Sequence, residues 1–336
     1  MRTTKFRVCP YAPSPKSLTL SSNRSNSTSA NRPLRIATRH SPLAMWQANH
    51  VAMLLEQAGQ PSELVPLVSS GDTDMRPIDS ARQVGVFTKR IQQALLDDEA
   101  DIAVHSMKDL PTEVDSRLHV VAVPAREIVN DCIVSPARWS LDSLPQRARI
   151  GTGSRRRAAQ LKYHRSDLVI EPIRGNLQTR LAKLSNGDYD AIMLAAAGIL
   201  RLEMESLPRI ELSLAQMLPA PGQGALAIEV LADAEATIEL ARCLNDPPSQ
   251  TAVTAERTLL ANLNGGCLAP IAAYAHLESD KLHLESVVLS VDGSKRLADQ
   301  RSISINPDDL QATAIEIANQ ATEVLASQGA RELIGR

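Results

Sequence analysis

The stretch that decides the fold class is Leu34-Arg-Ile-Ala-Thr38, followed three residues later by Ser41-Pro42. The first segment has the short apolar character of a β-strand. Ser41 is a preferred helix cap, and Pro42 suits the first position of a helix. Apolar residues then recur at helical spacing up to Gly59, and Glu63–Val68 is a second apolar run. A strand, a helix and a strand in this order predict a parallel or mixed sheet of an α/β protein.

The same alternation continues along the chain. A helix at 87–96 and a strand at 101–105 follow a polar stretch at 71–86, which we expect to be a long loop or flap. After a Pro-containing stretch at 124–145, the alternation starts again, with expected strands at 149–151, 168–173 and 190–195 and helices that begin at Ser154 and Asn176. A turn-rich linker at 218–224 leads into another strand at 225–230. These segments predict a second α/β lobe.

The pattern changes from about residue 247. A helix at 251–263 precedes Gly265-Gly266-Cys267, and strands at 269–276, 283–290 and 297–304 precede a long helix at 308–328. This order is typical of a separate α+β domain.

The net charge hides an uneven distribution. The chain has 336 residues and a net charge of −2, but residues 1–33 hold six basic side chains, seven serines and no acidic residue. Residues 34–336 therefore hold 30 basic and 38 acidic side chains, a net charge of −8. The N-terminal segment has the composition of an organelle transit peptide, but it lacks a clear amphipathic face, which favours a disordered tail or a start placed too far upstream.

Composition excludes several classes of protein. No apolar run approaches the ~20 residues that a membrane-spanning helix needs. The near-neutral charge and the eight aromatic residues argue against a general nucleic-acid binder. The four cysteines lack C-x-x-C spacing, so we expect no zinc site and no disulfide framework, and a reducing compartment. We expect Cys132 and Cys243 to be buried in the core.

Polar and cationic residues gather where predicted strands end. These segments are Arg39-His-Ser41, His105-Ser-Met-Lys-Asp109 and Gly151-Thr-Gly-Ser-Arg-Arg-Arg157. Ligands of open α/β sheets bind at this edge, and helix N-termini there favour anions. Arg174 and Arg180 repeat the pattern, and Arg201 follows an expected turn at 195–198. One arginine alone is usually a solvated surface charge, but this recurrence indicates a cleft for a ligand with several carboxylates or phosphates. The chain lacks the P-loop and dinucleotide-binding motifs.

Three further residues have both a structural and a functional interpretation. Asp109, beside Lys108, is either an ion-pair partner or a group that exchanges a proton with a leaving nitrogen and stabilises a nearby cation. His105 lies in an apolar strand and is best interpreted as structural. Cys267 is either a small buried side chain or a thiol that Gly265 and Gly266 present on a tight turn for covalent chemistry.

Six segments in register carry a resemblance to a known family. They are Arg35–Ala44, Ala103–Pro111, Gly151–Arg157, Arg174–Arg180, Pro221–Gly224 and Leu263–Cys267. Together they closely resemble the porphobilinogen deaminases, also called hydroxymethylbilane synthases, over about residues 34–336. The resemblance implies two lobes of the type II periplasmic-binding-protein form with mixed sheets, and a C-terminal α+β domain. The implied limits are 34–126 and 222–244 for domain 1, 127–221 for domain 2 and 247–336 for domain 3, after a leader at 1–33.

The resemblance also implies the reaction. The family joins four porphobilinogen molecules head to tail into hydroxymethylbilane and releases four ammonia molecules, a step of heme and chlorophyll synthesis. A dipyrromethane cofactor held through a thioether is the primer, and by position Cys267 is its anchor. Asp109 matches the catalytic acid. Cofactor contacts match Ser106, Lys108, Thr152, Ser154, Arg156, Arg157, Arg174 and Gln223, and substrate contacts match Arg39, Ser41, Arg180 and Arg201.

Some positions depart from the family pattern, and another class of protein stays open. Gly153 stands where a serine is common, Arg155 adds a cation, and the segment 80–86 is one residue short. The alternative is a non-catalytic, two-lobed protein that binds an anionic solute, which would leave Cys267 and the third domain unexplained. We expect a cytoplasmic monomer without nucleic-acid, membrane or metal partners, or a plastid or other organelle protein if residues 1–33 are a transit peptide.

Overall fold

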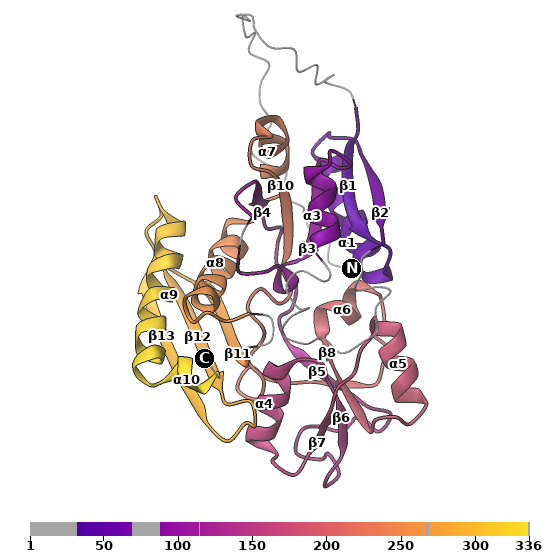
Figure 1. The fold of residues 1–336 in the computed structure, drawn as a ribbon, viewed down its shortest axis with the longest axis vertical. Helices are drawn as coiled ribbons and strands as arrows, with labels where there is room; N and C mark the ends of the chain where they lie inside the picture. The colour runs from indigo at the N-terminus through magenta and orange to yellow at the C-terminus, as the bar shows by residue number, and fades with distance from the viewer. Residues whose placement is uncertain (1–31, 69–87, 114, 267–268, 335–336) are drawn as a thin grey trace, which may run out of the picture.

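The first sheet combines the first four strands of the chain with one strand that returns to it after the second sheet has been formed (Figure 1). The computed structural model describes residues 32–68, 88–113, 115–266 and 269–334. The parallel strands of this sheet lie in the order β2–β1–β3, and β10 then pairs antiparallel with β3 and with β4. The bounds are β1 Leu34–Arg39, α1 Pro42–Gln57, β2 Ser62–Leu67, α3 Lys89–Leu96, β3 Ile102–Ser106, η1 Met107–Asp109, β4 Leu118–Ala122 and β10 Leu226–Leu231.

Local signals explain why these segments form. Ser41 caps α1, where its hydroxyl accepts a hydrogen bond from the amide of Ala44 at 3.4 Å. Ala44, Ala48, Val51 and Leu55 are buried along one face of this helix because they recur every three to four residues. β10 has five buried residues in a row, as a strand covered on both faces should have.

The second sheet has the order β7–β6–β8–β5–β9 and lies below the first in Figure 1. Its parallel strands β7, β6 and β8 are again followed by an antiparallel strand, here β5, and by an edge strand, β9. The bounds are β5 Asp131–Val134, β6 Arg149–Gly151, α4 Arg155–His164, β7 Val169–Glu171, α5 Leu177–Ser185, β8 Ala191–Ala195, α6 Ala196–Arg201 and β9 Arg209–Glu211. The two sheets therefore confirm the predicted pair of mixed α/β lobes.

The C-terminal part is an antiparallel sheet, β11–β12–β13, with helices α8 and α9 on one face. Side chains of these helices, Leu259 and Ile317 among them, bury that face together with Leu284. The opposite face packs against the second lobe through Val287 and Ala159. The bounds are α8 Pro247–Asn262, β11 Ile271–Glu278, β12 Lys281–Leu289, β13 Arg296–Ser304, α9 Leu310–Ser327 and α10 Ala330–Leu333, while the preceding helix, α7 Glu235–Arg242, packs on the first sheet through Ala241. This confirms the predicted α+β domain.

Several local predictions need correction. Cys243 is exposed, because it follows α7, whose only buried residue is Ala241, and the prediction that it lies in the core was wrong. Cys132 is buried as predicted. The segment that we expected to be a turn before Arg201 is the short helix α6. Cys267 and the expected flap at 71–86 lie outside the described residues. Within the described part of the chain, no helix is long and apolar enough to cross a membrane.

Candidate active site

The turn that carries Lys108 and Asp109 leaves the end of β3. It is the short helix η1, in which Met107 is buried while Lys108 and Asp109 are partly exposed. The amide of Met107 donates to the carbonyl of Ala225 at 3.0 Å, which fixes this turn against the segment that returns from the second lobe. Gly222 makes this approach possible, since a Cβ there would lie 2.6 Å from the Cγ of Met107.

Arg257 of helix α8 holds the same turn from the third domain. Its guanidinium donates to the carbonyls of Met107 at 3.2 Å, Leu110 at 3.1 Å and Pro111 at 2.6 Å. These carbonyls flank Lys108 and Asp109 on both sides, so Arg257 sets the position of the two side chains through the backbone. The residue carried no signal in the sequence, because its role depends on two segments about 150 residues apart.

A second contact joins this turn to the glycine pair before Cys267. The hydroxyl of Thr112 donates to the carbonyl of Gly265 at 3.3 Å. The loop after Asp109 and the loop that leads to Cys267 are therefore side by side. Cys267 itself lies outside the described residues.

Arg156 and Arg157 share one buried carboxylate. Arg156 donates to Asp131 at 2.6 Å, and Arg157 donates to the other oxygen of Asp131 at 2.7 and 3.1 Å. All three side chains are buried, at 0 to 7% exposure. Burial alone would raise the pKa of Asp131, but the two guanidinium groups outweigh it and hold that pKa well below its usual range. The sequence prediction missed Asp131, although one acidic residue opening an apolar strand is an available signal.

Gln223 connects this cluster to Lys108. Its amide nitrogen donates to Asp131 at 3.0 Å and to the carbonyl of Val129 at 2.6 Å, and its amide oxygen accepts from Lys108 at 3.2 Å. These hydrogen bonds form one network that links the two lobes. It begins at Lys108 in the first lobe, passes through Gln223, and ends in the second lobe at Asp131 and the two arginines that Asp131 pairs with. A group bound against it would contact both lobes.

The positive charges around Lys108 are not fully balanced. Burial, followed by the field of Arg157, lowers the pKa of Lys108 to about 8, while Asp109 and Asp131 oppose this shift. Burial, again with the field of Arg157, lowers the pKa of Arg180 to about 10, and Asp109 opposes that shift as well. Asp109 of the first lobe and Arg180 of the second therefore act on each other. An added carboxylate would relieve the repulsion among these cations.

Arg180 and Arg174 approach this cluster from the next unit of the second lobe. Arg174 follows β7, and Arg180 lies in α5, where its Nε donates to the carbonyl of Gly175 at 2.9 Å. Arg174 is partly exposed and contributes to the field that lowers the pKa of Arg180. The structure thus brings together Lys108, Asp109, Arg157, Arg174 and Arg180.

Arg201 belongs to a second group, next to the start of α1. It is buried, donates to the carbonyl of Gly224 at 2.6 Å and lies over the ring of Trp46 at 5.6 Å. Burial lowers its pKa to about 10. Burial and the charge of Arg201 also lower the pKa of His50, whose ring stacks on Trp46 at 5.1 Å. Arg39, which ends β1, and Ser41, which caps α1, lie at the same end of that helix.

The hydroxyl residues expected at the site have structural partners. Ser41 and Ser154 cap α1 and α4, Thr152 accepts from the amide of Ser154 at 3.2 Å, and Ser106 accepts from Gln47 at 2.8 Å. In each case the hydroxyl acts as an acceptor. A hydroxyl keeps one hydrogen to donate after accepting, so these groups can still bind a carboxylate. His105 is buried and lies 3.1 Å from Glu229, which supports the structural interpretation of that residue.

The cluster fits a ligand that carries several carboxylates. Each pyrrole of a dipyrromethane carries an acetate and a propionate, and the site supplies cations from both lobes. Arg156 adds an unpaired donor, since its buried Nε has no hydrogen-bond partner among the described residues. Lys108, Arg157, Arg174 and Arg180 would hold such a group beside Asp109.

Fold and site together define a two-lobed α/β protein whose lobes bring several cations together in one cluster, with a third domain attached. The family model described as "Porphobilinogen deaminase, dipyromethane cofactor binding domain" matches residues 34–239, and the model "Porphobilinogen deaminase, C-terminal domain" matches residues 250–323. The chain belongs to the porphobilinogen deaminase family. As a member it is a transferase of tetrapyrrole synthesis that acts on porphobilinogen and binds a dipyrromethane cofactor.

Solved binding proteins also resemble part of the chain. A nutrient-binding protein from Burkholderia cenocepacia, bound to methionine, is 15% identical with a TM-score of 0.40, and the match covers 64% of this chain and 92% of that one. A substrate-binding protein of an amino acid transporter from Streptococcus pneumoniae, bound to L-arginine, is 16% identical with a TM-score of 0.39, covering 63% and 86%.

Proposed function

We propose that the protein is a hydroxymethylbilane synthase that extends a dipyrromethane primer, held on Cys267 through a thioether, by four porphobilinogen units. The observation that carries this proposal is the position of Asp109. It lies on a turn that Arg257 clamps, directly after Lys108, where its charge acts on both Lys108 and Arg180, and Thr112 links the following loop to Gly265. A carboxyl group is thus held beside a group of cations, and the loop after it contacts Gly265, two residues before the proposed anchor in the sequence.

Asp109 would act on the incoming porphobilinogen. Its carboxyl donates a proton to the aminomethyl nitrogen and becomes a carboxylate, so that the carbon–nitrogen bond breaks and ammonia leaves. The carboxylate then stabilises the positive charge left on the pyrrole, and it accepts the proton released after the new carbon–carbon bond has formed. When bound, the dipyrromethane supplies the pyrrole carbon that forms this bond.

The cations would bind and orient the carboxylates. Asp109 acts electrostatically on Lys108 of the first lobe and on Arg180 of the second, and Arg157 acts on both of these cations. Each acetate or propionate bound by the three cations would therefore fix a pyrrole relative to that carboxyl. Arg39, Ser41 and Arg201 would hold the substrate from the start of α1. This arrangement favours the enzyme over a simple solute-binding protein, because binding alone does not need a clamped carboxyl beside the ligand.

Intact mass spectrometry tests the anchor directly. We expect the purified wild-type protein to exceed its sequence mass by one dipyrromethane, and the adduct to be absent from Cys267→Ser. The exposed Cys243 offers a matched control, and Cys243→Ser should keep the adduct. An active wild-type protein of unmodified mass would contradict the assignment of Cys267.

We further propose that the protein acts as a monomer in the cytoplasm. An organelle is the alternative if residues 1–33 are removed on import. The N-terminal sequence of the mature protein decides between the two compartments, since import would leave a new terminus near residue 33. Sedimentation at several concentrations tests the monomer, which should show one concentration-independent mass.

A further inference from the structure

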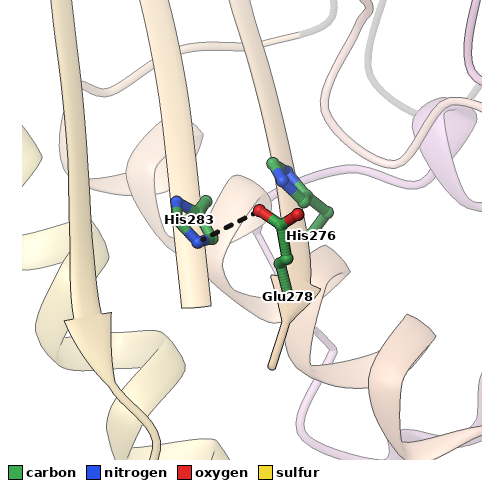
Figure 2. Close-up of side chains that lie close together, drawn as sticks. All are labelled: His276, Glu278 and His283. Atoms are coloured by element: carbon green, nitrogen blue, oxygen red, sulfur yellow. Dashed lines mark ion pairs between the residues drawn. The ribbon is translucent and has the colours of Figure 1, made fainter. Parts of the chain in front are cut away.

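The hairpin of β11 and β12 brings two imidazoles and a carboxylate together, far along the chain from the site described above. His276 and Glu278 lie two residues apart on β11 and therefore point to the same face. His283 of β12 is the direct partner of His276 in the antiparallel register. Figure 2 shows the carboxylate of Glu278 beside both rings. One ligand atom of each residue lies within 4.8 Å of the others.

We propose that His276, Glu278 and His283 form a binding site for a divalent transition-metal ion of the Zn²⁺ class. Two imidazoles and one carboxylate are a ligand set that such ions accept, with water in the fourth position. Hard ions such as Mg²⁺ prefer a set made only of oxygens, so the two histidines select against them.

An unpaired nitrogen supports a ligand at this place. The Nδ1 of His276 is buried and has no hydrogen-bond partner among the described residues. Leaving a buried polar atom unpaired is unfavourable, and a metal ion bound by its lone pair would remove that cost. Ring stacking explains part of the arrangement, because the ring of His276 lies between those of Tyr274 at 5.2 Å and His283 at 4.9 Å. Stacking accounts for neither the unpaired nitrogen nor the position of Glu278.

Metal binding requires the ligand atoms to move closer together and the stacked rings of His276 and His283 to rotate until their nitrogen lone pairs converge. Two nitrogens bound to one tetrahedral zinc ion at about 2.1 Å lie roughly 3.4 Å apart. The present separations exceed this value by up to about 1.4 Å. Rotation of the side chains can supply the movement, since His283 is 29% exposed and Glu278 is 72% exposed, and the Glu278 carboxylate is already 3.9 Å from Nε2 of His283. The exposed Glu278 also gives the ion a path from solvent.

The hairpin itself holds the ligands in register. The turn between the strands is only Ser279-Asp280, and Glu278 pairs with Lys281 directly beside it. A short turn fixes which residues face each other, so His276 and His283 stay opposite. Lys281 is exposed on the same face, where its ammonium would compete with a bound ion for Glu278. Glu285, two residues beyond His283, adds negative charge to that face.

Titration with metal ions tests the proposal on the full-length protein after chelation and buffer exchange. We expect isothermal titration calorimetry to show one Zn²⁺ site more in the wild type than in His283→Ala or His276→Ala. Glu278→Gln should weaken the site by at least about 10-fold, the loss caused even by residues that only support metal ligands. Lys281→Gln should strengthen it. MgCl₂ should give no binding at this site.

Controls separate the site from other zinc ligands. His119→Ala changes an exposed histidine on β4 and should bind as the wild type does. Because cysteine thiols also bind zinc, the comparison is repeated with Cys243→Ser as the background, where the same one-site difference is expected. The melting temperature without metal shows that each variant folds. Equal Zn²⁺ stoichiometry and affinity in the wild type and in folded His276→Ala and His283→Ala would overturn the proposal.

Discussion

The guanidinium of Arg126 and the carboxylate of Glu256 form two hydrogen bonds, at 2.7 and 2.9 Å. Arg126 lies where the chain crosses to the second lobe, and Glu256 lies in helix α8 of the third domain with its side chain fully buried. The same carboxylate accepts from the amide of Gly222, on the returning segment, at 2.7 Å and from that of Ala275 in β11 at 2.8 Å. The buried carboxylate of Glu256 therefore links the third domain to both segments that connect the two lobes.

Glu256→Gln should destabilise the protein by about 3–5 kcal/mol, because it leaves Arg126 buried without its counter-charge. Denaturant unfolding measures this as a lower midpoint. Glu239→Gln breaks an exposed ion pair with Arg242 and is the matched control, expected to change stability by no more than about 0.5 kcal/mol. Equal midpoints for the two variants would contradict the central role of Glu256.

Asp109→Ala should keep the fold and lower the turnover of porphobilinogen by roughly 10²- to 10⁴-fold, the range for a lost proton-transfer group. Its carboxyl makes no hydrogen bond that holds the described backbone together, so we expect the variant to fold, with a melting temperature lowered only by the loss of its charge beside Lys108 and Arg180. Asp115→Asn, in the same loop, is the matched control and should turn over normally. Ammonia release at a near-normal rate from Asp109→Ala would rule out the assigned role.

Arg257→Met should lower kcat by about 100-fold with little change in KM, since a small misplacement of a reacting group has an effect of this size. Methionine keeps an apolar stem but removes the donors to Met107, Leu110 and Pro111. Arg257→Lys should restore part of kcat. Arg242→Met, on exposed α7, controls for the loss of charge. If Arg257→Met lowers only the melting temperature, the residue is structural and does not position Asp109.

Lys108 should make stability depend on pH in protein prepared without cofactor. Its pKa is lowered from 10.5 to about 8, mainly by burial, so its charged form is unfavourable in the folded chain below pH 8. Between pH 8 and 10.5 the unfolded chain binds more protons, and stability rises with pH. Lys108→Gln should therefore raise the melting temperature at pH 7 by at least about 2 °C, the shift for roughly 1 kcal/mol, and by less at pH 10.

The exposed Lys89 supplies the control for this pH experiment. Lys89→Gln should change the melting temperature equally at pH 7 and pH 10. A gain from Lys108→Gln that is the same at both pH values would show that the charge on Lys108 is not the cause.

The hydrophobic pattern of the sequence predicted most of the parallel strands, because each of these strands is a short apolar run next to a helix cap or a turn. Ser41, Ser154 and Asn176 cap helices as predicted, and each side-chain oxygen accepts from an amide of the first turn. Strands β4, β5 and β9 escaped prediction. β9 has only the residues Arg209–Glu211, two of them charged, and it becomes a strand by pairing with β5 about 80 residues earlier. No local pattern contains that information.

The candidate site shows the same limit. Strand ends and recurring arginines indicated a cationic cleft. In the structure the charge of Arg157 acts on both Lys108 and Arg180 and lowers the pKa of each. The sequence pattern did not show that Asp131 pairs with two of the arginines, because this carboxylate meets them only after α4 packs on β5. Arg257 was missed for a similar reason, since one residue on a helix does not reveal which distant carbonyls it will meet.

The place of β10 in the first sheet also constrains how the chain is made. β3 pairs with β10, which is synthesised about 120 residues later, after every strand of the second sheet. Until then the emerging chain carries an open strand edge, which is a template for pairing with a neighbouring nascent chain. A ribosome-bound chain that stops before residue 226 would keep that edge open. Translation must therefore proceed through the whole second lobe before the first one can close.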